Sequence, residues 1–299
     1  MRALFIAFIF FSYFGNVHSQ EDSLKSYANR KLILGISAGG AAVAGSTALY
    51  YAWYKDYNTG SFHFFNDNSE WLQMDKAGHT LTTFQIGNAG YHACRWSGMT
   101  EKKSIFIGGS SGFAYMTIIE VMDGFSDGWG FSWGDMGCNA TGTTLFMTQQ
   151  YFWKEQRIKL KFSFHQSEYA KYRPNILGEN LSQQWLKDYN GQSYWLSVNP
   201  SSFMREETKF PKWLNIAIGY GADGMISGHD DYVIVQSDGK VIGNHRYRKT
   251  LLSLDVDLSR IKTKSKVLKA VLKTVNFIKV PFPAIELSKG KVRGHWLYF

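Results

Sequence analysis

One uncharged stretch, Leu32 to Tyr54, constrains the fold more than any other part of the chain. It runs for 23 residues without Asp, Glu, Lys, Arg or His, and about 20 apolar helical residues are enough to cross a bilayer. Gly35 and Gly39 have the four-residue spacing that lets helices approach closely in membranes. Aromatic residues gather at its end, as they do at membrane interfaces. The stretch predicts either a membrane-spanning helix or a fully buried helix of a soluble bundle.

The N-terminus has the pattern of an export signal. Arg2 precedes an apolar run from Ala3 to Phe14, and Ser19 offers a small residue at a cleavage position. We therefore expect residues 1–19 to be a signal peptide. An uncleaved anchor is the alternative, although the run is short for a bilayer span.

Export bears on the two cysteines, Cys94 and Cys138. An oxidising compartment allows them to form a disulfide, and two free buried thiols are equally compatible with the sequence. Two cysteines are too few for a metal site made of cysteines alone.

Three further helices are predicted after the uncharged stretch, at Asp75 to about Arg95, Ser104 to Met122 and Asp135 to Trp153. Gly108 and Gly112 again have the spacing for close packing. With the first stretch they predict a membrane-associated bundle of about four helices over residues 20–160. The fold class expected for the whole chain is mainly α, with a smaller α+β region at residues 161–299.

Polar residues recur at three- and four-residue spacing on these three helices, so each pair shares a helix face. If the faces converge, one buried pocket collects them: Asp75, His79, Glu120, Asp123, Asp135 and Asn139. Ionisable side chains in such apolar segments are costly to bury unless they are paired or bound. This pocket is the candidate site, and no member of it is assigned a catalytic role from sequence.

Three interpretations of the pocket remain open. Asp75, His79, Glu120 and Asp135 are candidate ligands of a divalent metal ion, because carboxylate oxygen and neutral imidazole suit Zn, Mn or Fe. Alternatively, adjacent carboxylates and His79 could perform acid–base chemistry without metal. The third interpretation is structural: Asp75 and Asp135 cap their helices while the other side chains satisfy one another.

The C-terminal region predicts short helices at Gln166 to Tyr172 and Glu179 to Tyr189, together with a few antiparallel strands. The strands are expected at Trp213 to Tyr220, Leu252 to Leu258, Ala284 to Leu287 and Lys291 to Phe299. Residues Lys264 to Phe277 predict an amphipathic helix, with valines and leucines on one face and lysines on most of the other. Such a helix suits an anionic membrane surface, or packs on the sheet as an ordinary surface helix.

The charge balance favours anionic partners. The chain carries a formal charge of +9, and 44% of its residues are hydrophobic. No stretch has a recognisable nucleic-acid-binding motif. Anionic membrane lipid is therefore the expected partner, with no nucleic acid, and protein partners are not indicated.

An ordered series of motifs carries a family resemblance: Asp75-Lys76-x-Gly78-His79, Glu120-x-x-Asp123-Gly124, Gly130-Phe131-Ser132 and Asp135-x-x-x-Asn139. The series resembles the uncharacterised YfiM-like family of predicted periplasmic lipoproteins, over roughly Leu32 to Phe203. It is more loosely similar to the VanZ-like membrane proteins, which carry a comparable series on helices. The resemblance implies an exported bacterial envelope protein with no established activity. The signal region here has no cysteine for lipid attachment.

Together these features predict a membrane-associated protein of the bacterial cell envelope, at the inner or the outer membrane. Its expected role is structural, or the binding of a lipid or other ligand through the polar pocket. The alternative is a membrane-embedded, hydrolase-like and possibly metal-assisted enzyme acting on an envelope lipid or lipid phosphate. A divalent metal is the cofactor considered.

Overall fold

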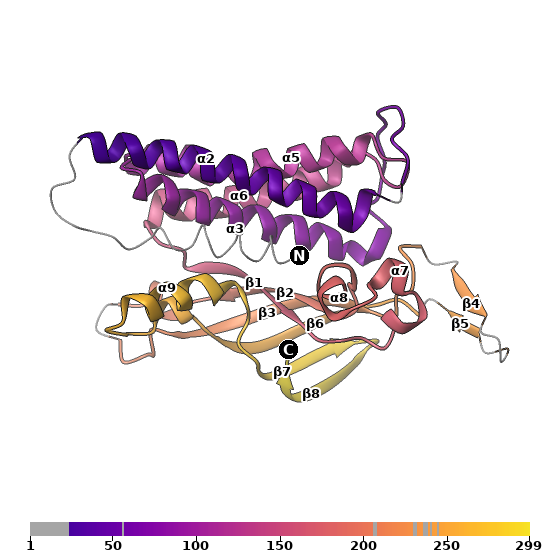
Figure 1. Cartoon of the computed structure of the whole chain (residues 1–299). Helices are drawn as coiled ribbons and strands as arrows, with labels where there is room; N and C mark the ends of the chain where they lie inside the picture. The colour runs from indigo at the N-terminus through magenta and orange to yellow at the C-terminus, as the bar shows by residue number, and fades with distance from the viewer. Residues whose placement is uncertain are drawn as a thin grey trace. The chain divides into compact units, whose positions relative to one another are not determined.

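The structure is a computed structural model that describes residues 24–55, 57–205, 208–229, 232–235, 239, 241–243 and 245–299. The expected signal peptide lies outside these residues. The chain divides into two compact units (Figure 1). The helical unit takes in the described residues up to Asn66, His79–Gln156 and Lys262–Val275, and the sheet unit takes in Asp67–Gly78, Arg157–Ile261 and Asn276–Phe299.

The helical unit contains the four helices expected from sequence. They are α2 (Leu24–Leu49), which continues as a π-helical segment at Tyr50–Tyr54, α3 (Met74–Trp96), α5 (Ser111–Gly124) and α6 (Trp133–Trp153). A short α4 (Glu101–Lys103) and a π-helical segment (Ser104–Gly108) precede α5. The amphipathic segment forms α9 (Lys266–Thr274), followed by a 3₁₀ turn at Val275–Phe277. Helix α3 begins within the sheet unit and continues into the helical unit.

Close approach between helices depends on glycine, as the small-residue spacing predicted. A Cβ added at Gly112 would lie 2.3 Å from the carbonyl oxygen of Thr83, and one at Gly108 would lie 2.4 Å from the backbone of Gly90. These contacts bring the start of α5 and the preceding turn against α3. Gly35 and Gly39, by contrast, have open space around the Cβ position, so their spacing on α2 does not mark a helix contact.

Among the described residues, two segments are long and apolar enough to cross a membrane, Tyr27–Leu49 and Glu101–Gly124. The first lies near the N-terminus, where a signal sequence has the same character. The second is one-third buried, whereas the core helix of a soluble protein is mostly buried. Two such helices are weak evidence for membrane spans. Length and composition alone therefore do not support the expected four-helix membrane bundle.

The sheet unit is built on six antiparallel strands in the order β1-β2-β3-β6-β7-β8 (Figure 1). Their bounds are β1 Ile158–Phe164, β2 Gln192–Val198, β3 Leu214–Asp223, β6 Tyr247–Val256, β7 Phe282–Ser288 and β8 Lys291–Tyr298. A separate ribbon pairs β4 (Val233–Val235) with β5 (Val241–Gly243). The unit also holds α7 (Pro174–Leu177), α8 (Leu181–Lys187) and 3₁₀ turns at Ala170–Tyr172, Pro200–Phe203 and Leu258–Arg260.

The α+β region expected at residues 161–299 is present, with a six-stranded antiparallel sheet where only a few strands were expected. The expectation that the chain as a whole is mainly α is met only in part, because this sheet makes the protein a mixed α+β structure. Strands β1 and β2 were missed because their alternating positions carry Lys and Ser where an ordinary buried strand carries aliphatic side chains. The helix expected at Gln166 to Tyr172 is reduced to its last turn.

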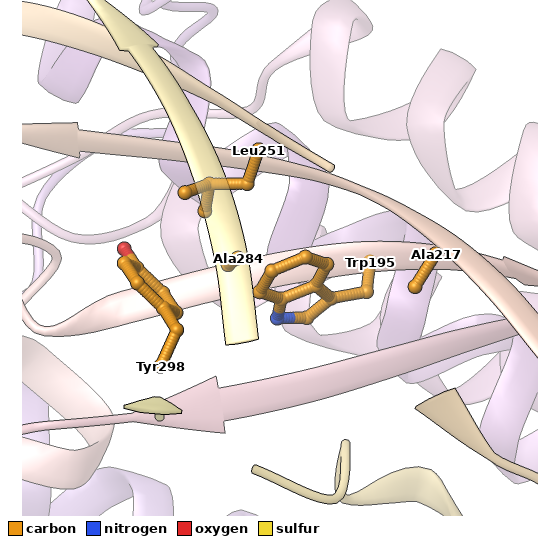
Figure 2. Packing of buried hydrophobic residues seen from close by; sticks show 5 residues of the cluster. All are labelled: Trp195, Ala217, Leu251, Ala284 and Tyr298. Atoms are coloured by element: carbon orange, nitrogen blue, oxygen red, sulfur yellow. The ribbon is translucent and has the colours of Figure 1, made fainter. Parts of the chain in front are cut away.

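The sheet buries a small apolar cluster on one face, drawn in Figure 2: Trp195, Ala217, Leu251, Ala284 and Tyr298. These residues come from β2, β3, β6, β7 and β8, and Trp195 supplies most of the volume. Its indole N–H donates to Ser163 Oγ at 2.9 Å, which satisfies the polar end of a ring that is 1% exposed.

Strand β6 is half-buried with a period of two, as expected, but its buried side chains between Leu252 and Asp255 are the polar ones. Leu252 and Leu254 are exposed, whereas Ser253 and Asp255 are buried. The same face of the sheet buries other polar and charged side chains, which sequence alone would place in solvent.

Candidate functional site

His79 is the centre of the polar cluster in the helical unit. It lies in the second turn of α3, and its side chain is 12% exposed. Its Nδ1 lies 3.1 Å from Asn139 Oδ1 and 3.5 Å from Glu120 Oε1. Its Nε2 lies 3.9 Å from Asp135 Oδ1. The structure thus brings together four of the six residues expected from sequence, from α3, α5 and α6.

The contact with Asn139 fixes the chemistry of the imidazole. An amide oxygen can only accept, so the Nδ1–H of His79 donates to it. In the neutral ring the lone pair then lies on Nε2, on the side of Asp135. Asn139 is fully buried, and its Nδ2 has no hydrogen-bond partner among the described residues. A buried polar atom left in this way calls for a water or a ligand nearby.

Glu120 is the most strongly perturbed acid of the cluster. It is 1% exposed, and burial raises its pKa to about 8, opposed by His79 and reinforced by Asp135. Its Oε2 accepts the backbone N–H of Ser132 at 3.1 Å, whereas Oε1 accepts no hydrogen bond from the described residues. At neutral pH the carboxyl is therefore largely protonated and can donate as well as accept.

The start of α6 shows how Asp135 enters the cluster. The helix is capped by Ser132, whose Oγ accepts the backbone N–H of Asp135 at 3.2 Å. The structural interpretation made Asp135 itself the cap, and this is wrong. Asp135 instead lies in the first turn, with its carboxyl buried and facing His79, so the cap is not its role. Ser132 joins Glu120 to α6 and was not singled out from sequence, although Ser-x-x-Asp before an apolar run is a recognised helix start.

Asp75 lies in the first turn of α3, four residues before His79 on the same continuous helix. This spacing places a carboxylate oxygen of Asp75 within 4.8 Å of a ring nitrogen of His79. Within the sheet unit, Asp75 Oδ1 accepts the hydroxyl of Tyr189 at 2.8 Å. Asp75, His79 and Asp135 thus each have an atom of the kind that ligates divalent metals.

Asp123 is held by a contact with Tyr54 rather than with His79. Its carboxylate accepts a short hydrogen bond from the hydroxyl of Tyr54. Burial raises the pKa of Tyr54, and Asp123 raises it further. Asp123 therefore ties the end of α5 to the turn after α2. No sequence spacing linked it to Tyr54, which is 69 residues away.

The cysteines are both free thiols. Cys94 is buried and Cys138 is half-buried, and burial raises the pKa of Cys94. A raised thiol pKa lowers the reactive thiolate fraction at neutral pH, so neither geometry nor ionisation marks Cys94 as a nucleophile.

Fold and site together define an α+β protein with a buried cluster of ionisable side chains in its helical unit. Residues 63–150 match the model of a family of unknown function, DUF2279, described as a predicted periplasmic lipoprotein. The match spans all six candidate residues. It supports the expected family of unknown function, but it confirms neither the YfiM name nor the likeness to VanZ-like proteins. No curated protein and no solved structure matches the chain.

The localisation expected from sequence is confirmed by this match. The protein is exported and associated with a membrane of the cell envelope. Both the inner and the outer membrane fit that description.

Proposed function

We propose that this envelope protein binds a divalent metal ion at the His79 cluster of its helical unit. The observation that carries the proposal is the hydrogen bond from His79 Nδ1 to Asn139 Oδ1, at 3.1 Å. It directs the Nε2 lone pair toward the side of Asp135. Histidines that ligate metals are commonly held in this manner, with the second ring nitrogen donating to a neighbouring acceptor.

The donor set fits a hard or borderline cation. Asp135 would supply a carboxylate oxygen, and His79 would supply the nitrogen, a combination that suits Zn, Mn or Fe. Asn139 would accept the Nδ1–H of His79 and so stabilise the tautomer whose Nε2 is free to bind the metal. A cation would also compensate the buried carboxyl of Asp135, which is 3% exposed.

A second candidate function is hydrolysis assisted by the metal, and Glu120 favours it. Its carboxyl is within 3.5 Å of His79, and its pKa of about 8 lies close to that of an efficient general acid or base at neutral pH. The substrate class we propose is an envelope lipid or its phosphate, in keeping with the localisation. A metal ion bound there would polarise a phosphoryl oxygen or lower the pKa of a bound water.

The partner we propose is anionic membrane lipid, bound through α9. Val267, Leu268 and Val271 are exposed, and so are Lys266 and Lys269. No acidic residue occurs from Lys262 to Val275. An exposed apolar stripe beside lysines is typical of helices that lie in the interface of an anionic bilayer.

Metal binding is tested on the full chain purified in detergent. Mn²⁺ and Zn²⁺ are titrated into the wild type, into His79→Ala and into a control, His63→Ala, which removes an exposed histidine of the same unit. We expect one equivalent to bind to the wild type and the control, and the affinity of His79→Ala to fall at least about 10-fold. Equal binding by all three proteins would refute the metal site.

Function is tested by complementing a deletion strain with His79→Ala and Glu120→Gln. Both variants are expected to fold but to fail to restore the wild-type phenotype. That result would exclude a purely structural role of the cluster. If both are degraded or unfolded while His63→Ala is normal, the cluster serves to hold the helices, and both the binding and the hydrolytic proposals fail.

A further inference from the structure

The six-stranded sheet has its polar and apolar faces reversed relative to a soluble sheet. The face that buries Trp195 also buries charged and hydrogen-bonding side chains from every interior strand: Ser193, Ser197, Asn215, Lys249, Ser253, Asp255, Glu286 and Ser288, with Lys161 from β1. The opposite face, here called the outer face, exposes aliphatic side chains. Soluble antiparallel sheets place these two classes the other way round.

The strand register makes the outer face a continuous apolar belt. Leu196 pairs with Ile218, Ile218 with Leu252, and Leu252 with Ile285, across β2, β3, β6 and β7. These four side chains are 38%, 52%, 49% and 53% exposed, respectively, with the rest of the chain present. A second row pairs Ile216 with Leu254, and both are exposed. Such a patch marks an interaction surface.

The ends of the belt differ in chemistry. At the end where β3 begins and β8 finishes, Trp213 and Trp296 are exposed, and Trp296 is 94% exposed. At the other end, three basic residues are exposed around the start of β6 and the β7–β8 turn: Arg248, Lys289 and Lys291. Arg248 donates to Gln73 Oε1 at 2.7 Å, and Lys289 lies over the ring of Tyr247, so Lys291 and the outward side of Lys289 supply the charge of this end. The outward positions of the described strands carry no acidic residue.

We propose that the outer face of the sheet docks on an anionic lipid bilayer. The aliphatic side chains match the acyl chains of the bilayer, and the tryptophans at one end match its interface. The basic residues at the other end match acidic headgroups. The chemistry thus favours lipid over a protein partner, and the protein is associated with an envelope membrane. This surface shares no residue with α9 or with the His79 cluster, and the inference does not rest on either.

The topology limits how deep the sheet can go. Its outermost strands are β1 and β8, and the described residues do not pair them with each other. An open sheet edge leaves backbone groups unsatisfied in hydrocarbon, so the sheet does not span the bilayer. It lies with its outer face against the boundary between headgroups and acyl chains.

The test places a polarity-sensitive NBD fluorophore on the outer face. Ile218→Cys is labelled in the full chain and reconstituted in vesicles of phosphatidylcholine with 30% phosphatidylglycerol. Val235→Cys, labelled and reconstituted in the same way, is the matched control. Val235 is 66% exposed on the β4–β5 ribbon of the same unit. Cys94 and Cys138 are less accessible than either introduced thiol, and unsubstituted protein gives their background.

We expect brominated lipid to quench the label at position 218 at least twofold more than the label at position 235, with a blue-shifted emission. Replacing phosphatidylglycerol by phosphatidylcholine should reduce that quenching. Equal quenching at both positions would overturn the proposal, whether or not α2 or α9 anchors the protein. A disulfide-linked dimer through Ile218→Cys with no lipid quenching would overturn it in favour of a second copy of the chain. Circular dichroism confirms that both variants are folded.

Discussion

The buried ion pair between Lys161 and Asp255 provides a stringent test of the sheet unit. Both side chains are 0% exposed, and Lys161 Nζ lies 2.7 Å from Asp255 Oδ2 and donates to the carbonyl of Val256 at 2.8 Å. Removing one partner of such a pair leaves an uncompensated buried charge, which costs about 3–5 kcal/mol. We expect that cost for Lys161→Met, and a similar one for Asp255→Leu.

The double replacement separates charge from packing. Asp255 also accepts from Ser197 Oγ at 2.6 Å and from the backbone N–H of Val280 at 3.2 Å. Lys161→Met with Asp255→Leu leaves those donors without their acceptor, at about 1–3 kcal/mol each, but it removes both charges. The double variant should therefore cost less than the sum of the single variants by at least about 2 kcal/mol.

Hydrogen exchange of the amides in β1 and β6 measures these free energies locally, without requiring that the two units unfold together. Lys154→Met is the control, because the Lys154–Glu101 pair is exposed and should contribute no more than about 1 kcal/mol. Additive effects of the two single replacements, or a cost of Lys161→Met no larger than the control, would refute the reasoning.

Three further predictions follow from single side chains. Burial lowers the pKa of Lys279 to about 8 from an ordinary value of 10.5, so the unfolded chain binds more protons between these values and stability should rise with pH across this window by about 1–3 kcal/mol. Lys279→Met should reduce the rise in a series of urea titrations, and an unchanged profile would contradict it. A Cβ at Gly142 would lie 2.1 Å from the carbonyl oxygen of Thr80, so Gly142→Ala should lower the melting temperature. Gly137 has open space around its Cβ position, so Gly137→Ala should raise the melting temperature slightly. The same shift in both variants would be inconsistent with close helix packing at Gly142. Asn139→Ala should weaken Zn²⁺ binding about 10- to 100-fold in calorimetry while His79 is intact, and unaltered affinity would show that the tautomer is not set by this amide.

The helical half of the chain could be predicted because its signals are local. Apolar runs broken by glycine and polar turns predicted helices that overlap α3, α5 and α6, and the three- and four-residue spacing placed each polar pair on one face of its own helix. Convergence itself requires close helix contacts, which the glycine spacing at Gly108 indicated.

The sheet could not be predicted in the same way, because its local pattern is inverted. A period of two locates β6 but does not say which face is buried, and the usual rule of apolar side chains inside gives the wrong answer for Leu252. From sequence, Lys161 is predicted to be a solvated charge. Only the strand register shows that it contacts Asp255. The pairing of Asp123 with Tyr54 likewise depends on tertiary structure that no local spacing reveals.

The most direct test of the central claim, a metal site at His79, is the visible absorption spectrum of the full chain titrated with Co²⁺. The wild type should develop ligand-field bands that saturate at one equivalent, and His79→Gln should lose them while remaining folded. Identical spectra for the wild type and His79→Gln, or no bands in either, would contradict the claim.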